Sequence, residues 1–140
     1  PFYNENYQFE YGKADLLREG KDITVIAGGS MVTTAVKVAE ELKGEISVEV
    51  INVSTLKEID LDTVLPSLKK TGRLITLEDH NALSGLAGQV NSVIAQEKLA
   101  VDINNMAVRQ YQLSGTSDEL YQVAGLGADT LEKACRAMTA

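Results

Sequence analysis

A short stretch in the middle of the chain holds the residue types best suited to chemistry, Glu78-Asp79-His80 followed by Ser84. His80 is the only histidine, and an imidazole beside carboxylates is a usual way to tune a proton carrier. One hypothesis is a hydrolase that uses Ser84 and His80, but a triad is recognised by spatial roles and not by closeness in sequence. One histidine with two acids offers too few ligands for a zinc site. We favour a loop held by side-chain hydrogen bonds and salt links to a neighbouring domain or subunit.

A second candidate segment, Gly28-Gly29-Ser30, follows an apolar run and precedes a helical pattern. Free backbone N–H groups and the helix dipole could bind an anion there. The segment lacks the lysine of a P-loop and the full GxGxxG pattern, so we favour a tight strand-to-helix turn. Arg109 could reach a phosphate, but a single arginine is a weak signal. Cys135 lies on the apolar face of the last helical pattern, which predicts a buried structural thiol.

The elements that must position these segments begin with a strand and a helix. Ile23–Ala27 is a β-branched run typical of a buried strand. From Met31 apolar residues recur at the spacing of one helix face. Ser30 is the expected N-cap of this helix. Gly44 is expected to end it.

Two further strands complete the frame. Glu45–Val53 alternates apolar and polar residues, and Arg73–Glu78 is a third apolar run. Strand, helix and strand form a right-handed βαβ unit with parallel strands. Gly28–Ser30 and Glu78–His80 should then lie at the carboxyl edge of one sheet and face one crevice. A regulatory module that binds phosphate or a nucleotide in this crevice is the alternative function.

Weaker patterns predict the remaining elements. Lys13–Arg18 and Ile23–Ala27 flank a Glu19–Asp22 turn and predict a β-hairpin. Pro66 predicts either a kinked helix or one that begins near it. Asn104-Asn105 predicts a turn in a connection over 101–106. The other expected elements are a helix capped by Asp60, a helix over 85–98, a strand over 107–111, a helix that begins at Ser117 and a final helix capped by Asp129.

Composition narrows the classes of protein. The 140 residues are 44% hydrophobic and 24% charged, which is ordinary for a soluble domain with its own core. The net charge of −7 argues against nucleic acid and anionic lipid as partners. One cysteine excludes an intrachain disulfide and suits the cytoplasm. Apolar runs fall well short of the roughly 18 residues that a membrane span needs.

The N-terminal segment, residues 1–11, is rich in aromatic residues and has no regular period. Two hypotheses remain open for it: an arm packed on its own domain, or a linker that lies against a neighbouring domain. The sequence begins at Pro1 without an initiator methionine. We therefore expect a domain that belongs to a larger protein.

Several stretches together follow a known family pattern. Its most specific parts are Gly12-Lys13-Ala14, Glu19-Gly20-Lys21-Asp22, and Glu78-Asp79-His80 with Gly85 and Gly88. With these residues the chain resembles the C-terminal domain of transketolase over residues 7–138, in particular that of the split, two-subunit enzymes. It is also similar to the corresponding domains of deoxyxylulose-phosphate synthase and the pyruvate dehydrogenase beta subunit. Family members often have glycine in place of Ser84 and proline in place of Glu58.

The resemblance implies a three-layer α/β domain over residues 12–140, with a five-stranded, mixed but mostly parallel sheet flanked by helices. It implies that residues 1–11 are a linker arm from a pyrimidine-binding domain. The family transfers two-carbon ketol units between sugar phosphates with thiamine diphosphate and a divalent metal such as Mg²⁺, which other domains bind.

For this chain the resemblance therefore implies a structural and assembly role in the cytoplasm, with no catalytic, cofactor-binding or metal residue. The isolated domain should be inactive. Its partners would be the remaining transketolase domains or an N-terminal subunit, in a homodimer or heterotetramer. The residues expected at an interface or anion site are Gly28, Gly29, Ser30, Glu78, Asp79, His80 and Ser84.

Overall fold

A five-stranded sheet in the order β1-β3-β2-β4-β5 forms the centre of the computed structural model, which describes residues 3–111 and 114–140. The strands are β1 (Ala14–Arg18), β2 (Ile23–Ala27), β3 (Val48–Val53), β4 (Arg73–Asn81) and β5 (Asp102–Val108). Strands β2 to β5 are parallel, and β1 is an antiparallel edge strand. This confirms the mixed, mostly parallel sheet.

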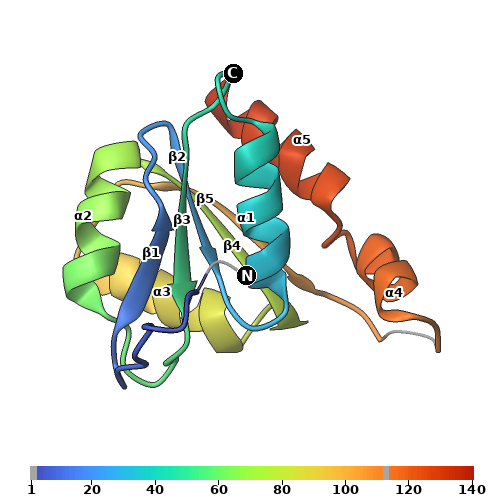
Figure 1. Ribbon diagram of the computed structural model, residues 1–140, viewed down its shortest axis with the longest axis horizontal. Helices are drawn as coiled ribbons and strands as arrows, with labels where there is room; N and C mark the ends of the chain where they lie inside the picture. The colour runs from blue at the N-terminus through green and yellow to red at the C-terminus, as the bar shows by residue number, and fades with distance from the viewer. Residues whose placement is uncertain (1–2, 112–113) are drawn as a thin grey trace.

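Helices cover both faces of the sheet (Figure 1). They are α1 (Met31–Glu41), α2 (Leu61–Thr71), α3 (Gly85–Gln96), α4 (Ser117–Ala124) and α5 (Ala128–Thr139). Along β2, Val25 and Ala27 join the core beneath α1 and α5, whereas Ile26 joins the core beneath α2 and α3. Because both faces of the sheet are buried, β2 is apolar at every position except Thr24. Helix α4 lies beyond α5 at the outer end of the domain and has no buried residue.

The edge strand β1 pairs with β3, so the predicted β-hairpin between β1 and β2 is wrong. The chain crosses the end of β3 between them. The backbone N–H groups of Lys21 and Asp22 both donate to the Ser47 carbonyl, at 3.1 and 3.0 Å. Strands β1 and β2 therefore lie on opposite sides of β3, and Gly20 passes directly over that strand.

The segment predicted as a connection over 101–106 is strand β5, and the strand predicted over 107–111 covers only its end. Asn104 and Asn105 stand in register with Ile75 and Thr76 of β4. The Thr76 hydroxyl donates to the Asn105 side chain at 2.8 Å. An edge strand tolerates Asn105 because its side chain finds a partner on β4, which local turn propensity does not reveal.

Two predicted helix caps are displaced. The cap of α4 is Thr116 and not Ser117: Thr116 and Glu119 form a reciprocal capping box. Helix α5 is preceded by Gly127, and Asp129 lies in its first turn. There the carboxylate still favours the positive end of the helix.

Helix α2 begins at Leu61 and runs through Pro66, so a start near Pro66 is wrong. Asp60 occupies the N-cap position, but no side-chain cap bond forms. Its carboxylate instead accepts from the Ala14 backbone N–H at 3.1 Å and from the Thr63 hydroxyl at 2.9 Å. Asp60 thus joins the start of α2 to the edge strand.

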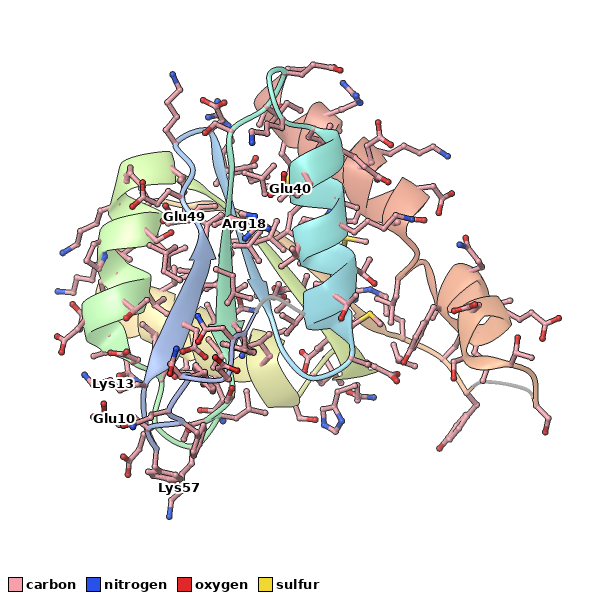
Figure 2. The ribbon with its side chains drawn as sticks, in the orientation of Figure 1. Glu10, Lys13, Arg18, Glu40, Glu49 and Lys57 are labelled. Atoms are coloured by element: carbon pink, nitrogen blue, oxygen red, sulfur yellow. The ribbon has the colours of Figure 1, made fainter. Side chains whose placement is uncertain are left out.

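Ion pairs join the helices to the β1–β3 side of the sheet. Arg18 of β1 lies beside Glu40 of α1 in Figure 2, where the two form an ion pair. Glu49 of β3 is only 2% exposed and pairs with Lys70 of α2. Its carboxylate also accepts from the Gly20 backbone N–H at 3.1 Å. Burial opposes ionisation, but the bonds from Lys70, Ser67 and Gly20 outweigh it and lower the pKa of Glu49.

The ionised Glu49 should make stability depend on pH. Because its pKa is lower in the folded chain than in the unfolded chain, its contribution is present above the unfolded value of 4.5 and is lost as the pH falls through the folded value. Glu49→Gln should lower the free energy of unfolding by about 2 kcal/mol at pH 7 and flatten its decline from pH 6 to pH 3. Urea unfolding across this range measures both. Glu58→Gln, which removes an exposed carboxylate, is the control, and an equally steep decline in both variants would contradict the assignment.

Candidate functional site

A cavity of about 690 Å³ opens at the carboxyl edge of the parallel strands. Gly28–Ser30 after β2 and Glu78–His80 at the end of β4 both line it, as parallel strands require. Asn52 and Ser54 from the end of β3 and Tyr3 from the N-terminal segment complete its polar lining. Four apolar side chains also contribute: Val32, Val53, Leu56 and Leu86.

Glu78 is not in a loop, because β4 continues to Asn81, which pairs with Val108 of β5. The Glu78 side chain is buried, and the residue is 4% exposed. Its two carboxylate oxygens accept from the backbone N–H groups of Leu86 and Ala87, each at 2.8 Å. Glu78 therefore binds the N-terminus of α3, where backbone donors and the helix dipole favour a negative charge. Both oxygens are engaged, so this carboxylate is not a free general base.

Gly85 is required by the same arrangement. Its φ of +76° is disfavoured for residues with a side chain. A Cβ atom there would lie 2.4 Å from Glu78 Oε2 and 2.5 Å from His80 Cδ2. At Gly88 a Cβ would lie 3.4 Å from the Leu83 carbonyl oxygen, which is an ordinary contact distance. Gly85 therefore lets α3 start close against the end of β4, whereas the space at Gly88 does not require glycine.

His80 and Ser84 do meet: the Ser84 hydroxyl lies 3.2 Å from His80 Nε2, and both side chains are exposed. A hydrolytic triad also needs a carboxylate that orients the imidazole. Glu78 is committed to α3, and Asp79 accepts a bond from Tyr121. Within residues 3–111 and 114–140 no carboxylate is recorded in contact with His80, so the geometry does not support the hydrolase hypothesis.

Tyr121 of α4 reaches the rim of the cavity. Its hydroxyl lies 3.0 Å from Ser30 Oγ and 3.2 Å from Asp79 Oδ2. Ser30 occupies the predicted N-cap position of α1, but it has helical backbone angles and its side chain makes no cap bond. The two predicted segments are joined by a residue that sequence reasoning did not select. Its one signal is an aromatic residue in a short helix.

The N-terminal segment packs on its own domain through two tyrosines. The hydroxyls of Tyr3 and Tyr7 lie 2.6 and 3.0 Å from the same Asp15 oxygen, and Asn52 Nδ2 lies 2.6 Å from the Tyr3 hydroxyl. Burial, together with the adjacent carboxylate, raises the pKa of Tyr3. Tyr3 and Asn52 were missed as site residues. A polar residue within the apolar run of β3 was the available signal for Asn52.

The described residues do not support metal or thiol chemistry. Among them no group of three or more His, Cys, Asp and Glu side chains could hold a metal ion. Cys135 is fully buried, and burial raises the pKa of its thiol to about 11. This confirms the buried structural thiol. None of the described helices is long and apolar enough to cross a membrane.

The charge of the cavity limits what it can bind. Among the described residues that line it, none is lysine or arginine, whereas Asp79 is exposed at its rim. A phosphate or diphosphate needs cationic side chains or several free backbone N–H groups. The anion site expected at Gly28–Ser30 therefore lacks a cationic partner in this cavity.

Comparison with known proteins identifies the family. Residues 12–131 match the model described as transketolase, C-terminal domain. The chain belongs to this family. The five strands, the turn at Gly20 and the Glu78–Gly85 contact all lie within the matched residues.

Curated relatives agree with this assignment. The chain is 39% identical over 138 residues to the 6-deoxy-6-sulfo-D-fructose transketolase subunit SqwH of Clostridium sp. (strain MSTE9), covering 97% of this chain and 42% of that protein. It is 34% identical over 131 residues to a putative transketolase C-terminal section of Methanocaldococcus jannaschii, covering 92% and 40%. It is 42% identical over 87 residues to the pyruvate dehydrogenase E1 component subunit beta of Bacillus subtilis, covering 61% and 27%. The chain thus spans less than half the length of these relatives.

Solved structures share the fold. A split-gene transketolase described as an inactive beta4 tetramer superposes with a TM-score of 0.91 at 28% identity, over 99% of this chain and 46% of that one. Transketolase from Leishmania mexicana superposes with a TM-score of 0.66 at 18% identity, over 90% and 18%. The first confirms the transketolase C-terminal fold over nearly the whole chain, and the second shows a similar fold.

Proposed function

We propose that this chain is the structural and assembly domain of a transketolase-type enzyme that transfers two-carbon ketol units between sugar phosphates. The observation that carries the proposal is the role of Glu78 in the structure. Glu78 is the most buried acid of the candidate site, and its carboxylate binds the N-terminus of α3 and does not face a substrate. The family membership supplies the reaction class. In this proposal the domain has no catalytic residue and is inactive alone.

Thiamine diphosphate and Mg²⁺ would be bound elsewhere in the complete enzyme. The described residues do not fit them, because the cavity lining has no lysine or arginine for a diphosphate and no group of metal ligands. The alternative of a regulatory module for phosphate or a nucleotide meets the same difficulty. The cavity therefore suits contact with a neighbouring polypeptide better than binding of a polyanion.

The partners in this proposal are the remaining transketolase domains or a separate N-terminal subunit, in a cytoplasmic homodimer or heterotetramer of sugar-phosphate metabolism. The split-gene and beta-subunit descriptions of its relatives support such an assembly. Residues 1–11 would be the arm that leads from a pyrimidine-binding domain. The contacts of Tyr3 and Tyr7 with Asp15 support a fixed path for that arm.

Reconstitution tests the function. The complete gene product that carries this chain, with its N-terminal subunit where one is encoded separately, is supplied with thiamine diphosphate and Mg²⁺. Ketol transfer from fructose 6-phosphate to an aldose phosphate is measured, with 6-deoxy-6-sulfofructose as a second donor. We expect transfer by the complete enzyme, a loss of at least about 10³-fold when residues 12–140 are deleted, and no turnover by the 140-residue chain, because preorganised catalytic sites fail when their support is removed.

Pyruvate is the control donor, since one group of relatives comprises pyruvate dehydrogenase beta subunits. Decarboxylation of pyruvate without ketol transfer would contradict the transketolase assignment while keeping the assembly role. Turnover by the isolated chain would overturn the assembly role itself.

A further inference from the structure

A second cleft lies at the carboxyl ends of β4 and β5, next to the cavity described above. It has a volume of about 450 Å³ and is lined by His80, Asn81, Val108, Arg109, Gln110 and Tyr111. We use the name Arg109 corner for residues 80–83 and 108–111, which include these lining residues and also Leu83. None of the described residues that line this cleft carries a carboxylate, although the chain as a whole has a net charge of −7.

The backbone of the corner is held in place. The Ala82 N–H donates to the Val108 carbonyl at 3.1 Å, and the Leu83 N–H donates to Asn81 Oδ1 at 2.9 Å. These bonds tie the loop after β4 to the end of β5. The corner therefore presents its side chains from a fixed support and not from a free loop.

Arg109 differs from the two arginines that form ion pairs, Arg18 and Arg136. Its guanidinium donates to the Asn105 carbonyl at 2.9 Å, which orients the group. In the part of the chain that the structure describes, no carboxylate pairs with Arg109, and its other N–H groups have no recorded acceptor. The guanidinium is exposed and oriented, so it can receive an external carboxylate on two N–H groups at once.

Two exposed apolar side chains belong to the same corner as this cation. Leu83 is 91% exposed, and Tyr111 is fully exposed. Single exposed apolar residues are common, but arginine and tyrosine are the residue types enriched at the energetic centres of protein interfaces. An oriented arginine in one corner with an exposed leucine and an exposed tyrosine is the composition of such a centre.

We propose that the Arg109 corner is a docking site for a segment of the complete enzyme outside these 140 residues, and that this segment presents an aspartate or glutamate beside an apolar residue. The carboxylate would bind Arg109, and the apolar residue would pack on Leu83 and Tyr111. Charge complementarity favours this occupant. The permanently charged side chain among the described residues of the cleft is Arg109, and no described carboxylate pairs with it. The inference rests on the assembly role proposed above and names the chemistry of one contact.

A free phosphate explains the corner less well. One arginine supplies little of the charge that a phosphate requires, and no lysine lies among the described lining residues. A phosphate would also leave Leu83 and Tyr111 exposed to water. A docked polypeptide covers all three side chains.

The test uses the complete enzyme. A photoreactive benzoylphenylalanine replaces Tyr111, and mass spectrometry identifies the cross-linked peptide. We expect a peptide from outside residues 1–140 that contains Asp or Glu.

A second measurement uses Arg109→Glu. Reversing the charge removes a desolvated ion pair, so the association constant of the complete enzyme, measured by sedimentation velocity, should fall roughly 30-fold or more. Replacing the cross-linked acid by arginine in the Arg109→Glu variant should restore association.

A matched control separates docking from general effects. Lys21→Glu makes the same charge reversal just before β2, at the amino end of the parallel strands. Equal weakening by Lys21→Glu and Arg109→Glu, or none by either, would overturn the inference. So would a cross-link to residues 1–140 of a second copy. Binding of inorganic phosphate that Arg109→Glu abolishes, with assembly unchanged, would assign the corner to a small anion instead.

The proposed function is assayed separately on the same samples. If the enzyme transfers ketol units and Arg109→Glu leaves its association unchanged, only the docking site is refuted. Normal docking without ketol transfer would refute only the reaction class.

Discussion

Replacing Glu78 by alanine is expected to lower the free energy of unfolding by about 3 kcal/mol and to loosen the start of α3. The variant leaves the N–H groups of Leu86 and Ala87 without the acceptors that hold them at 2.8 Å. Leu86 and Ala87 are both buried, so water cannot readily replace the carboxylate as the acceptor for their N–H groups. A buried donor without a partner costs about 1–3 kcal/mol, and the helix dipole adds to the loss.

Urea unfolding measures the loss in stability, and amide hydrogen exchange at Leu86 and Ala87 localises it. Glu78→Gln keeps one side-chain acceptor and should lose about half as much. Asp79→Asn, one residue along the strand but exposed, should change stability by less than about 1 kcal/mol. A Glu78→Ala variant with wild-type stability and unchanged exchange at α3 would show that the carboxylate is free for another role.

The central sheet could be predicted from sequence because its strands are buried on both faces. Ile23–Ala27 and Arg73–Glu78 are continuous apolar runs, and periodicity identifies such runs directly. Strand β5 could not be found this way, since Asn104 and Asn105 have the local preferences of a turn. The bond from Thr76 to Asn105 that makes the strand acceptable joins residues far apart in the chain.

The candidate site could likewise be predicted only in part from the sequence. Parallel strands place Gly28–Ser30 and Glu78–His80 at one edge, so their shared cavity follows from strand direction alone. Tyr3 and Tyr121 reach that cavity from the two ends of the chain, and no local pattern marks either contact. The role of Glu78 was also hidden, because an acid that binds a helix N-terminus eight residues away resembles an acid available for catalysis.

Gly20 shows how a sequence signature can report packing. An added Cβ would lie 2.1 Å from the Glu49 backbone nitrogen and 2.3 Å from the Val48 carbonyl carbon. These are main-chain atoms of β3, which is paired with β1 on one side and β2 on the other. The strand cannot move away without breaking one of the two ladders, and the Gly20 N–H would also lose Glu49.

Gly20→Ala is therefore expected to cost more than about 4 kcal/mol, a large share of the roughly 5–15 kcal/mol that stabilises a domain. Thermal and urea unfolding measure the loss, and far-UV circular dichroism shows whether the variant folds. Gly29→Ala is the control: Gly29 has a positive φ, +60°, which Gly20 does not, and no atom lies within 4 Å of its added Cβ. Its replacement should cost only about 1 kcal/mol, from backbone strain alone. Equal losses at the two glycines would contradict the assignment, because they would show that contact with β3 adds nothing at Gly20. A much larger loss at Gly20 would tie the Glu19–Asp22 turn to the crossing of β3.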